Sequence, residues 1–305
     1  MALNDTVTFG ISLPHRSTEP IAAAAVRAVA QRAEALGFAD LWVTNNTIDD
    51  AWCLDSITLL AYAAAVTTTI RLGVAVLVLP TYQPVHVAQQ VATLDQLSDG
   101  RAILGVGLGR ADEYDVFQVP TARRVTRFNE SVGLMKALWA SPRATYEGEL
   151  YRVRDATLGT RPRQQPHPPL WVGGHHPAAI RRAAEMADGW MGAGGSSLAS
   201  LAAAVPLLHA ALTRAGRDPA TFPVSKRIFL SVHERHEDAR AELDHWFRGV
   251  YRNPDGTDTF GVYGTPDDVH SQLEAFAATG ATHLLLNPVA RYAEHVEVLA
   301  EIVAR

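Results

Sequence analysis

The stretch IRLGVAVLVLPTYQPVHVAQQVATLDQLSDGRAILGVG, residues 70–107, decides the fold. Its first part, Ile70–Leu79, is a long run of mostly β-branched and aliphatic residues that predicts a buried strand. Val85–Leu97 has helical periodicity and ends at a Ser-Asp-Gly turn, and Ala102–Val106 predicts a second buried strand. Strand, helix and strand at this spacing predict two parallel strands joined by a helix.

The same alternation continues in both directions along the chain. Six further strands are expected, at Val7–Ser12, Leu41–Thr44, Leu170–Val172, Gly189–Met191, Val224–Val232 and His283–Leu286. Further helices are expected at Ile21–Leu36, Leu54–Val66, Val125–Trp139, Ala178–Ala187, Leu198–Ala215, Asp238–Phe247, Pro266–Ala278 and Ala293–Val303. Eight strands, each followed by a helix, predict an α/β fold of the (β/α)8 TIM barrel type. A doubly wound open sheet is the alternative, but the first turn, Ser-Leu-Pro-His at residues 12–15, lacks its glycine fingerprint.

The regular alternation is interrupted after the fourth expected strand. A polar loop at Arg110–Pro120, a helix, an expected hairpin at Tyr146–Val153 and a proline-rich connector at Pro162–Pro169 precede strand five. We therefore expect an insertion after strand four. The sequence contains no internal repeat and no low-complexity linker, so we expect one domain over residues 1–305.

Composition excludes several classes of protein. The 27 Lys and Arg residues against 32 Asp and Glu residues give a net charge of −5, and the absence of a basic run disfavours a nucleic-acid partner. The single cysteine, Cys53, excludes an internal disulfide and a cysteine-based zinc site. No apolar run is long enough to cross a membrane, and the first five residues lack the charge of a secretory signal. We expect a cytoplasmic protein with no membrane or nucleic-acid partner.

In a (β/α)8 barrel the active site lies at the carboxyl ends of the strands. The ends of strands two to six offer no pair of carboxylates, which disfavours a glycosidase. Gly-x-Ser-x-Gly and His-Glu-x-x-His motifs are also absent, so acyl transfer and zinc hydrolysis have no support.

Two glycine-rich turns are the strongest local signals. Gly173-Gly174-His175-His176 ends strand five, and Pro177 suits the first turn of the next helix, so this turn favours an anion such as phosphate. A tight turn without a ligand is the alternative, and the histidine pair lacks a third metal ligand, so no metal site is expected. Gly105, Gly107 and Gly109 after strand four fit one wall of a cofactor pocket or, alternatively, tight packing. Arg110 beyond them either meets an anionic group or is solvated.

Taken in order, these segments resemble the luciferase-like flavin-dependent oxidoreductase family over nearly the whole chain. The most specific match runs through Leu72–Thr81, Pro84-Val85, Leu94–Arg101 and Gly105–Gly109. Further matches are Gly37-Phe38, Leu41-Trp42, Pro168–Gly174, Asp188–Trp190 and Gly264–Asp267. The resemblance implies a (β/α)8 barrel that binds FMN or the deazaflavin F420, with the phosphate near Gly173–His176. It also implies a non-proline cis peptide at Ala75–Val76 against the cofactor ring, and a homodimer.

One departure from the family concerns proton transfer. Many members place a histidine just after strand two, where this chain has Asn45-Asn46. Asparagine hydrogen-bonds a cofactor carbonyl but does not shuttle a proton near neutral pH. We therefore take His15, beyond strand one, as the substitute acid or base, with Asn46 as a further catalytic and cofactor-binding candidate and His233 as a weaker acid–base candidate.

F420 is favoured over FMN because its acidic tail suits arginines in the expected insertion. These are Arg110, Arg123, Arg124, Arg127, Arg161 and Arg163, and solubilising an exposed surface is their alternative role. The resulting hypothesis is F420-dependent hydride transfer to or from a small organic substrate, with Tyr114, Phe117, Trp190 and Tyr251 expected to line its pocket. An FMN-dependent monooxygenase served by a flavin or F420 reductase, and a binding protein without turnover, remain the alternatives.

Overall fold

A ring of eight parallel strands forms the centre of the computed structural model, which describes residues 2–305 apart from the side chain of Asp112. Neighbouring strands around the ring are β1, β3, β5, β6, β9, β10, β11 and β13, and pairing of β13 with β1 and of β10 with β11 closes it. Their bounds are β1 Thr8–Ser12, β3 Asp40–Val43, β5 Arg71–Val78, β6 Ala102–Gly107, β9 Leu170–Gly173, β10 Gly189–Gly192, β11 Val224–Val232 and β13 His283–Pro288. The predicted (β/α)8 barrel is confirmed.

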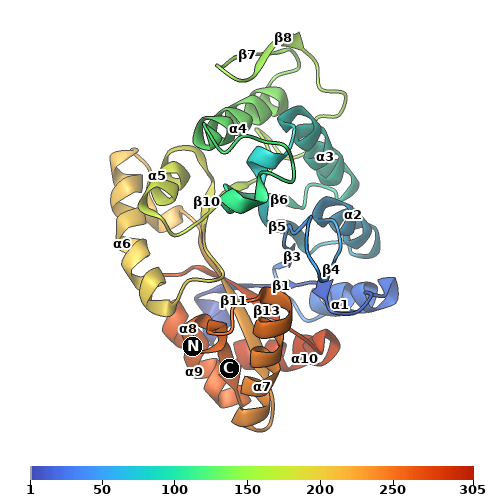
Figure 1. Cartoon of the computed structure of the whole chain (residues 1–305), viewed down its shortest axis with the longest axis vertical. Coiled ribbons are helices and arrows are strands. Elements are labelled where there is room, and N and C mark those ends of the chain that lie inside the picture. The colour runs from blue at the N-terminus through green and yellow to red at the C-terminus, as the bar shows by residue number, and fades with distance from the viewer. Residues whose placement is uncertain (1) are drawn as a thin grey trace.

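Helices surround the strands on the outside of the ring (Figure 1). They are α1 Ala23–Ala35, α2 Ser56–Val66, α3 Pro84–Leu97, α4 Arg124–Ala140, α5 Pro177–Met186, α6 Leu198–Arg214, α7 His236–Trp246, α9 Pro266–Ala277 and α10 Tyr292–Val303. Each lies within a few residues of its expected bounds. Helix α1 ends, as its sequence predicts, before Gly37, whose φ of 83° is the left-handed conformation that glycine adopts readily. None of the helices in residues 2–305 has the length and apolarity needed to cross a membrane.

Between β6 and β9, residues 108–169 contain α4 and the hairpin of β7 Ala144–Glu147 with β8 Arg152–Ala156. The hairpin projects beyond α4, at the top of Figure 1. Sequence reasoning missed the small ladder of β2 Arg16–Ser17 with β4 Trp52–Cys53, the π-helical turn Phe247–Tyr251, the short helix α8 Gly256–Phe260 and the strand β12 Val262–Gly264.

The amino end of the barrel is held by a buried ion pair. The Asp40 carboxylate is fully buried and accepts hydrogen bonds from His283 Nε2 at 2.9 Å, from the Arg71 guanidinium at 2.7 Å and from the Trp42 indole. Burial alone would raise the pKa of Asp40, but the charge and hydrogen bond of His283, together with Arg71, hold it below its usual value. A paired charge of this kind fixes β3 against β5 and β13.

In the barrel interior, glycines lie opposite large side chains and leave space for them. A Cβ at Gly73 would fall on the Trp42 ring, and one at Gly189 would lie 2.7 Å from Trp171. Nearer the carboxyl end, β5 changes its register with β6 between Val74 and Leu77. The Val76 side chain there faces Gly107 and Gly173 on the two following strands, where an added Cβ would approach it to 2.7 and 2.8 Å.

This contact predicts the cost of a methyl group at Gly107. We expect Gly107→Ala to lower the free energy of unfolding by about 1–3 kcal/mol, because overpacking a close contact forces its neighbours to move. Gly159→Ala, where an added Cβ meets no atom within 4 Å, is the matched control and should change little. Denaturant unfolding measures both, and adding Val76→Ala to Gly107→Ala should recover most of the loss. An equal loss with and without Val76 would contradict this packing.

Candidate active site

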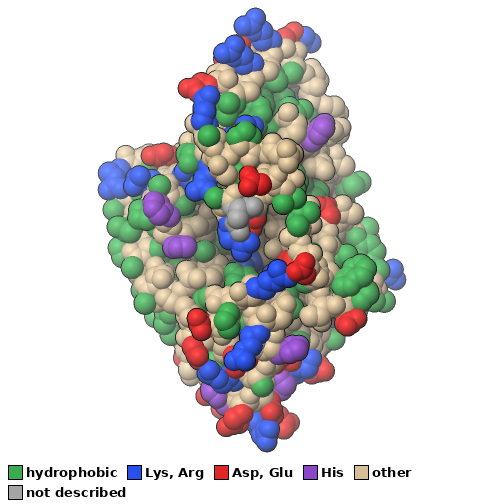
Figure 2. Space-filling view, viewed as in Figure 1, with side chains coloured by type: hydrophobic (Ala, Val, Ile, Leu, Met, Phe, Trp, Pro, Cys, Tyr) green, Lys and Arg blue, Asp and Glu red, His purple; other side chains and the backbone are tan. Residues whose placement is uncertain are grey.

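Two cavities open at the carboxyl ends of the barrel strands. Cavity A, about 390 Å³, lies among β6, β9, β10 and the start of α5. Cavity B, about 580 Å³, lies among the segments that follow β1 and β3 and the residues near Tyr251. Ala75, Val76, Arg227 and Tyr251 line both, so the cavities meet at the bulge of β5. Figure 2 shows a face of the molecule that is hollowed near its centre, with basic side chains at the hollow.

The structure brings most of the predicted site residues to one of these cavities, whereas Gly105 and His233 line neither of them. Gly107, Gly109, Gly173, Gly174, His175 and His176 line cavity A. His15 and Asn46 line cavity B, while Ala75 and Val76 line both. Among the described residues, no group of three or more His, Cys, Asp or Glu side chains is placed to hold a metal ion.

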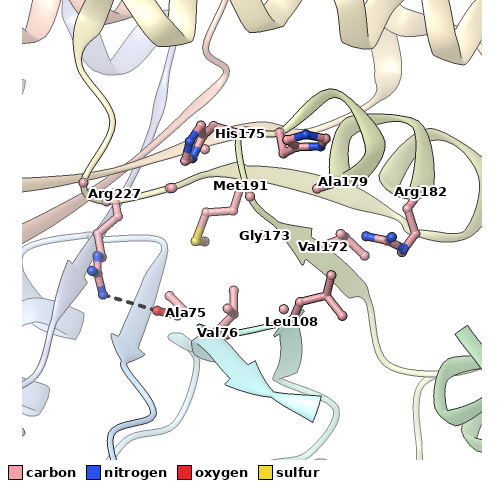
Figure 3. Close-up of a pocket in the computed structure, with 18 of the residues that line it drawn as sticks. Ala75, Val76, Leu108, Val172, Gly173, His175, Ala179, Arg182, Met191 and Arg227 are labelled. Atoms are coloured by element: carbon pink, nitrogen blue, oxygen red, sulfur yellow. Dashed lines mark hydrogen bonds between the residues drawn. The ribbon is translucent and has the colours of Figure 1, made fainter. Parts of the chain in front are cut away.

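The Ala75–Val76 peptide bond is cis, as the resemblance predicts. The Ala75 carbonyl accepts a hydrogen bond from Arg227 Nη1 at 3.3 Å, which ties β5 to β11 across the barrel mouth (Figure 3). Figure 3 also shows the Val76 side chain lying near Leu108, which follows β6, and Gly173, which ends β9. Gly107 and Gly173 therefore line cavity A and also give Val76 its space.

The turn after β9 leads directly into helix α5. Gly174 has a φ of 134°, its N–H donates to the Met191 carbonyl at 3.0 Å, and its carbonyl accepts from the Trp190 indole at 2.7 Å. His176 is the N-cap of α5, where its Nδ1 accepts from the Ala178 N–H at 3.2 Å. An anion at this helix start would accept from the same amide that His176 now caps.

Arginines line cavity A on the side of α4 and α5. Arg182, on α5, is buried, its Nε donates to Asn129 Oδ1 at 3.0 Å, and its guanidinium lies 5.3 Å from the centre of the Phe128 ring. Burial lowers the pKa of Arg182. Arg124 lines the same cavity from the start of α4. Sequence reasoning missed Arg182, because a helical pattern does not distinguish it from the exposed Arg181 beside it.

Of the six insertion arginines considered as partners of an acidic tail, two line a cavity and four do not. Arg124 lines cavity A and Arg110 lines cavity B. The other four contact groups outside both cavities: Arg123 pairs with Glu149, Arg127 donates to the Tyr151 hydroxyl, Arg161 donates to the Ala140 carbonyl and Arg163 pairs with Asp99.

The expected aromatic lining also needs correction. Trp190 is buried within β10 and Tyr114 is buried with its hydroxyl on the Leu108 carbonyl, so neither lines cavity A or B. Phe117 lines a separate, smaller hollow of about 190 Å³. Tyr251 lines both main cavities, as expected.

His15 is buried, although it lies in the loop that follows β1. Its Nδ1 lies 2.7 Å from the Leu13 carbonyl and its Nε2 lies 2.7 Å from the Thr44 hydroxyl, which in turn lies 3.0 Å from Asn46 Oδ1. Burial lowers the pKa of His15 to about 4, and the positive charges of Arg227 and Arg16 also lower it. The imidazole is therefore neutral at pH 7, with Nδ1–H donating to the Leu13 carbonyl and Nε2 free to accept from Thr44.

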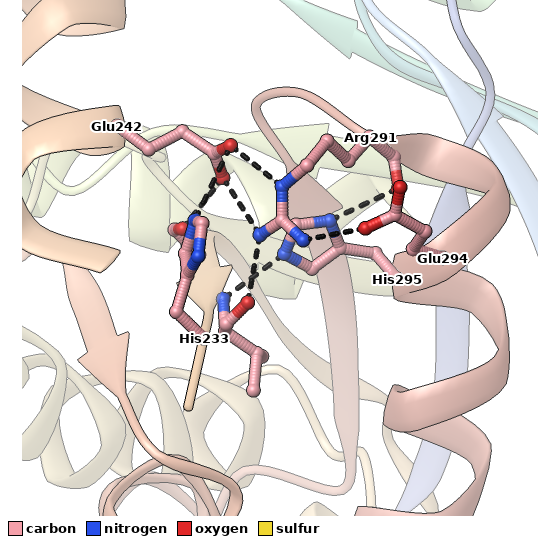
Figure 4. Close-up of polar contacts among 7 residues, drawn as sticks. His233, Glu242, Arg291, Glu294 and His295 are labelled. Atoms are coloured by element: carbon pink, nitrogen blue, oxygen red, sulfur yellow. Dashed lines mark hydrogen bonds and ion pairs between the residues drawn. The ribbon is translucent and has the colours of Figure 1, made fainter. Parts of the chain in front are cut away.

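His233 lies in a different polar cluster (Figure 4). Its Nε2 is 3.5 Å from Glu242 Oε1, and Glu242 accepts from Arg291 Nε at 2.8 Å. His295 Nε2 accepts from the Val232 N–H at 3.0 Å in the same cluster. These contacts join β11 to α7 and α10, and His233 lines neither cavity A nor cavity B.

Residues 7–256 match the model of the luciferase-like monooxygenase family. The chain belongs to this family. It is 32% identical over 240 residues to an F420-dependent glucose-6-phosphate dehydrogenase of Kineococcus radiotolerans, which covers 75% of this chain and 70% of that relative. In fold it is similar to the monooxygenase RslO1 of Streptomyces bottropensis, with a TM-score of 0.84, 23% identity, and coverage of 97% of this chain and 98% of that one. An F420-dependent secondary alcohol dehydrogenase in complex with an F420-acetone adduct also has a TM-score of 0.84, with 22% identity and coverage of 98% and 99%.

The neutral state of His15 in this luciferase-like protein predicts a stability that depends on pH. The unfolded chain takes up a proton on His15 below its ordinary pKa of 6.5, whereas the folded chain does so only below about 4. Stability is therefore lost as the pH falls from 6.5 to 4, by about 3 kcal/mol on this account, since one pKa unit is about 1.4 kcal/mol. Denaturant unfolding measures the free energy of unfolding across this pH range, and we expect His15→Gln to lose markedly less of it than the wild type. His175→Gln, which alters an exposed histidine, is the control, and parallel curves for His15→Gln and the wild type would contradict a buried neutral His15.

Proposed function

We propose that the chain is an F420-dependent oxidoreductase that transfers hydride between F420 and a small organic substrate, with the cofactor in cavity A and the substrate in cavity B. The observation that carries the proposal is the meeting of two cavities of different chemistry at Ala75 and Val76. Relatives named for F420-dependent reactions support the choice of cofactor.

The residues of cavity A fit a flat ring with an anionic tail. Glycine backbone at Gly107, Gly173 and Gly174 leaves room for close approach, and the helix start near His176 favours phosphate. Arg124 and Arg182 lie farther along the same cavity, where guanidinium groups suit phosphate and carboxylate oxygens. When bound, F420 supplies the hydride chemistry, while the protein supplies binding, orientation and proton handling.

The hydrogen-bonded series His15, Thr44 and Asn46 is suited to hold a proton next to cavity B. Thr44 has one hydroxyl proton, which it donates to His15 Nε2 while His15 is neutral. If His15 Nε2 gains a proton, it becomes the donor, and the Thr44 hydroxyl is then free to donate to Asn46 Oδ1 at 3.0 Å. We propose that this exchange lets His15 take or supply the proton that accompanies hydride transfer, in place of the histidine that other members carry after strand two. A homodimer and a partner reductase remain predictions from the resemblance.

Anaerobic titration with F420 and with FMN, each oxidised and reduced, tests the function. We expect F420 to bind and to change its absorbance on addition of a substrate, with glucose 6-phosphate as the first compound to try because of the relatives' names. Binding of reduced FMN followed by oxygen consumption would replace the proposal with a monooxygenase. Binding of F420 without turnover of a substrate panel would leave a carrier protein.

Two adjacent arginines of α5 provide a matched test of the cofactor site. Arg182→Gln should weaken F420 binding by about tenfold, or about 1.4 kcal/mol, because Arg182 lines cavity A. Arg181→Gln removes the same charge from the exposed side of the same helix and should leave binding unchanged. Fluorescence titration measures both dissociation constants, and circular dichroism verifies folding. Equal affinity in the two variants would place the anionic part of the cofactor elsewhere.

A further inference from the structure

Arg227 is a positive charge at the junction of the two cavities, and its contacts with the described residues are to neutral groups. Its Nη1 donates to the Ala75 carbonyl at 3.3 Å, its guanidinium lies 4.5 Å from the centre of the Phe229 ring, and the Tyr251 hydroxyl is a further partner. Its Nε is buried and has no hydrogen-bond partner in the described part of the chain. None of the described carboxylates lies within ion-pair distance of it.

The other arginines that line cavity B each have an acidic partner. Arg16 pairs with Asp49 at 2.5 Å, Arg252 pairs with Asp50, and Arg110 lies 3.5 Å from Glu113. Asp49 and Glu113 are the acidic side chains that line cavity B among the described residues. Both carboxylates are therefore already paired with other arginines, and neither compensates the charge of Arg227.

A partly buried charge without an acidic partner is costly, and such groups persist where a ligand completes them. We propose that cavity B binds an organic anion, and that the Arg227 guanidinium recognises its carboxylate or phosphate group. This inference rests on the proposed function, since it assigns a class of substrate to the cavity beside the cofactor site. It also assigns specificity to a strand residue that sequence reasoning missed.

Other features of cavity B describe the remainder of the ligand. Phe229, Trp246 and Tyr251 form an aromatic wall, and Asn46 and Asn287 contribute amides. The Trp246 indole N–H is buried without an acceptor, so it is a second donor that lacks a partner. A guanidinium fixed by a carbonyl and a ring face presents its remaining N–H groups in a rigid fork, the arrangement that binds carboxylate or phosphate oxygens best. The occupant is therefore a small organic molecule with one anionic end.

Calorimetric titration of the protein without cofactor tests this with two matched pairs of probes, glucose 6-phosphate with glucose and benzoate with benzamide. We expect the wild type to bind the anion of at least one pair about tenfold or more tighter than its neutral partner, and the responding pair distinguishes phosphate from carboxylate. Arg227→Gln should reduce this preference to within about threefold, a larger loss than any loss of F420 affinity in the same variant. Arg252→Gln removes a charge from the same cavity that is already paired, and should keep the preference.

Three results would overturn the inference. They are a wild type without preference for either anion, an Arg227→Gln variant that retains the preference, and an Arg227→Gln variant whose main loss is F420 affinity, which would assign Arg227 to the cofactor. If Arg227→Gln does not fold, competition in the wild type decides: inorganic sulfate should displace the organic anion but not its neutral partner. Because these titrations need no cofactor, failure of F420 to bind would remove the proposed function and leave the anion site standing.

Discussion

Space inside the barrel is the constraint on which the rest of this structure depends. Eight strands enclose room for few large side chains, and several of these side chains face a glycine: Trp42 faces Gly73 and Trp171 faces Gly189 on the neighbouring strand, and Val76 faces Gly107 on β6 and Gly173 on β9. A register slip of one residue would place a Cβ against each of these side chains. The same packing holds Ala75 and Val76 where they form the shared wall of two cavities. The contacts that pack the core therefore also determine the geometry of the site.

The two ends of the barrel differ in how their charged side chains are compensated. At the amino end, the buried Asp40 carboxylate contacts the buried His283 and the exposed Arg71, so that its charge is matched. At the carboxyl end, the buried Lys226 ammonium donates to the Ala193 and Ser196 carbonyls, which fixes the loop that borders cavity A, and burial lowers its pKa to about 7. Arg227, the next residue, contacts neutral groups. The carboxyl end thus holds a guanidinium that a bound ligand can neutralise.

The sequence predicts the fold well because strands and helices follow from local patterns. Strand β11 has the predicted bounds, Val224–Val232, and the resemblance also locates the cis peptide at Ala75. Site residues could be predicted from the sequence when they adjoin strand ends, as His15 and the glycines do. Arg227 and Arg182 were missed because each lies inside a regular element, where local pattern does not say which wall of a cavity a side chain reaches. The contact of Gly107 with Val76 joins residues of different strands, so only the three-dimensional pairing reveals it.

Proton handling and charge recognition are coupled in cavity B. Burial is the main reason that His15 is neutral, but the charges of Arg227 and Arg16 lower its pKa as well. An anion bound at Arg227 would neutralise one of these charges and so raise the proton affinity of His15. By thermodynamic linkage, a protonated His15 would bind the anion more tightly by the same factor. In the proposed function, this coupling would favour proton uptake by His15 when the anionic substrate is bound. In the proposed function the unpaired arginine and the buried histidine serve one reaction, and the Thr44 hydroxyl between His15 and Asn46 adjusts its hydrogen bond to the protonation state of His15.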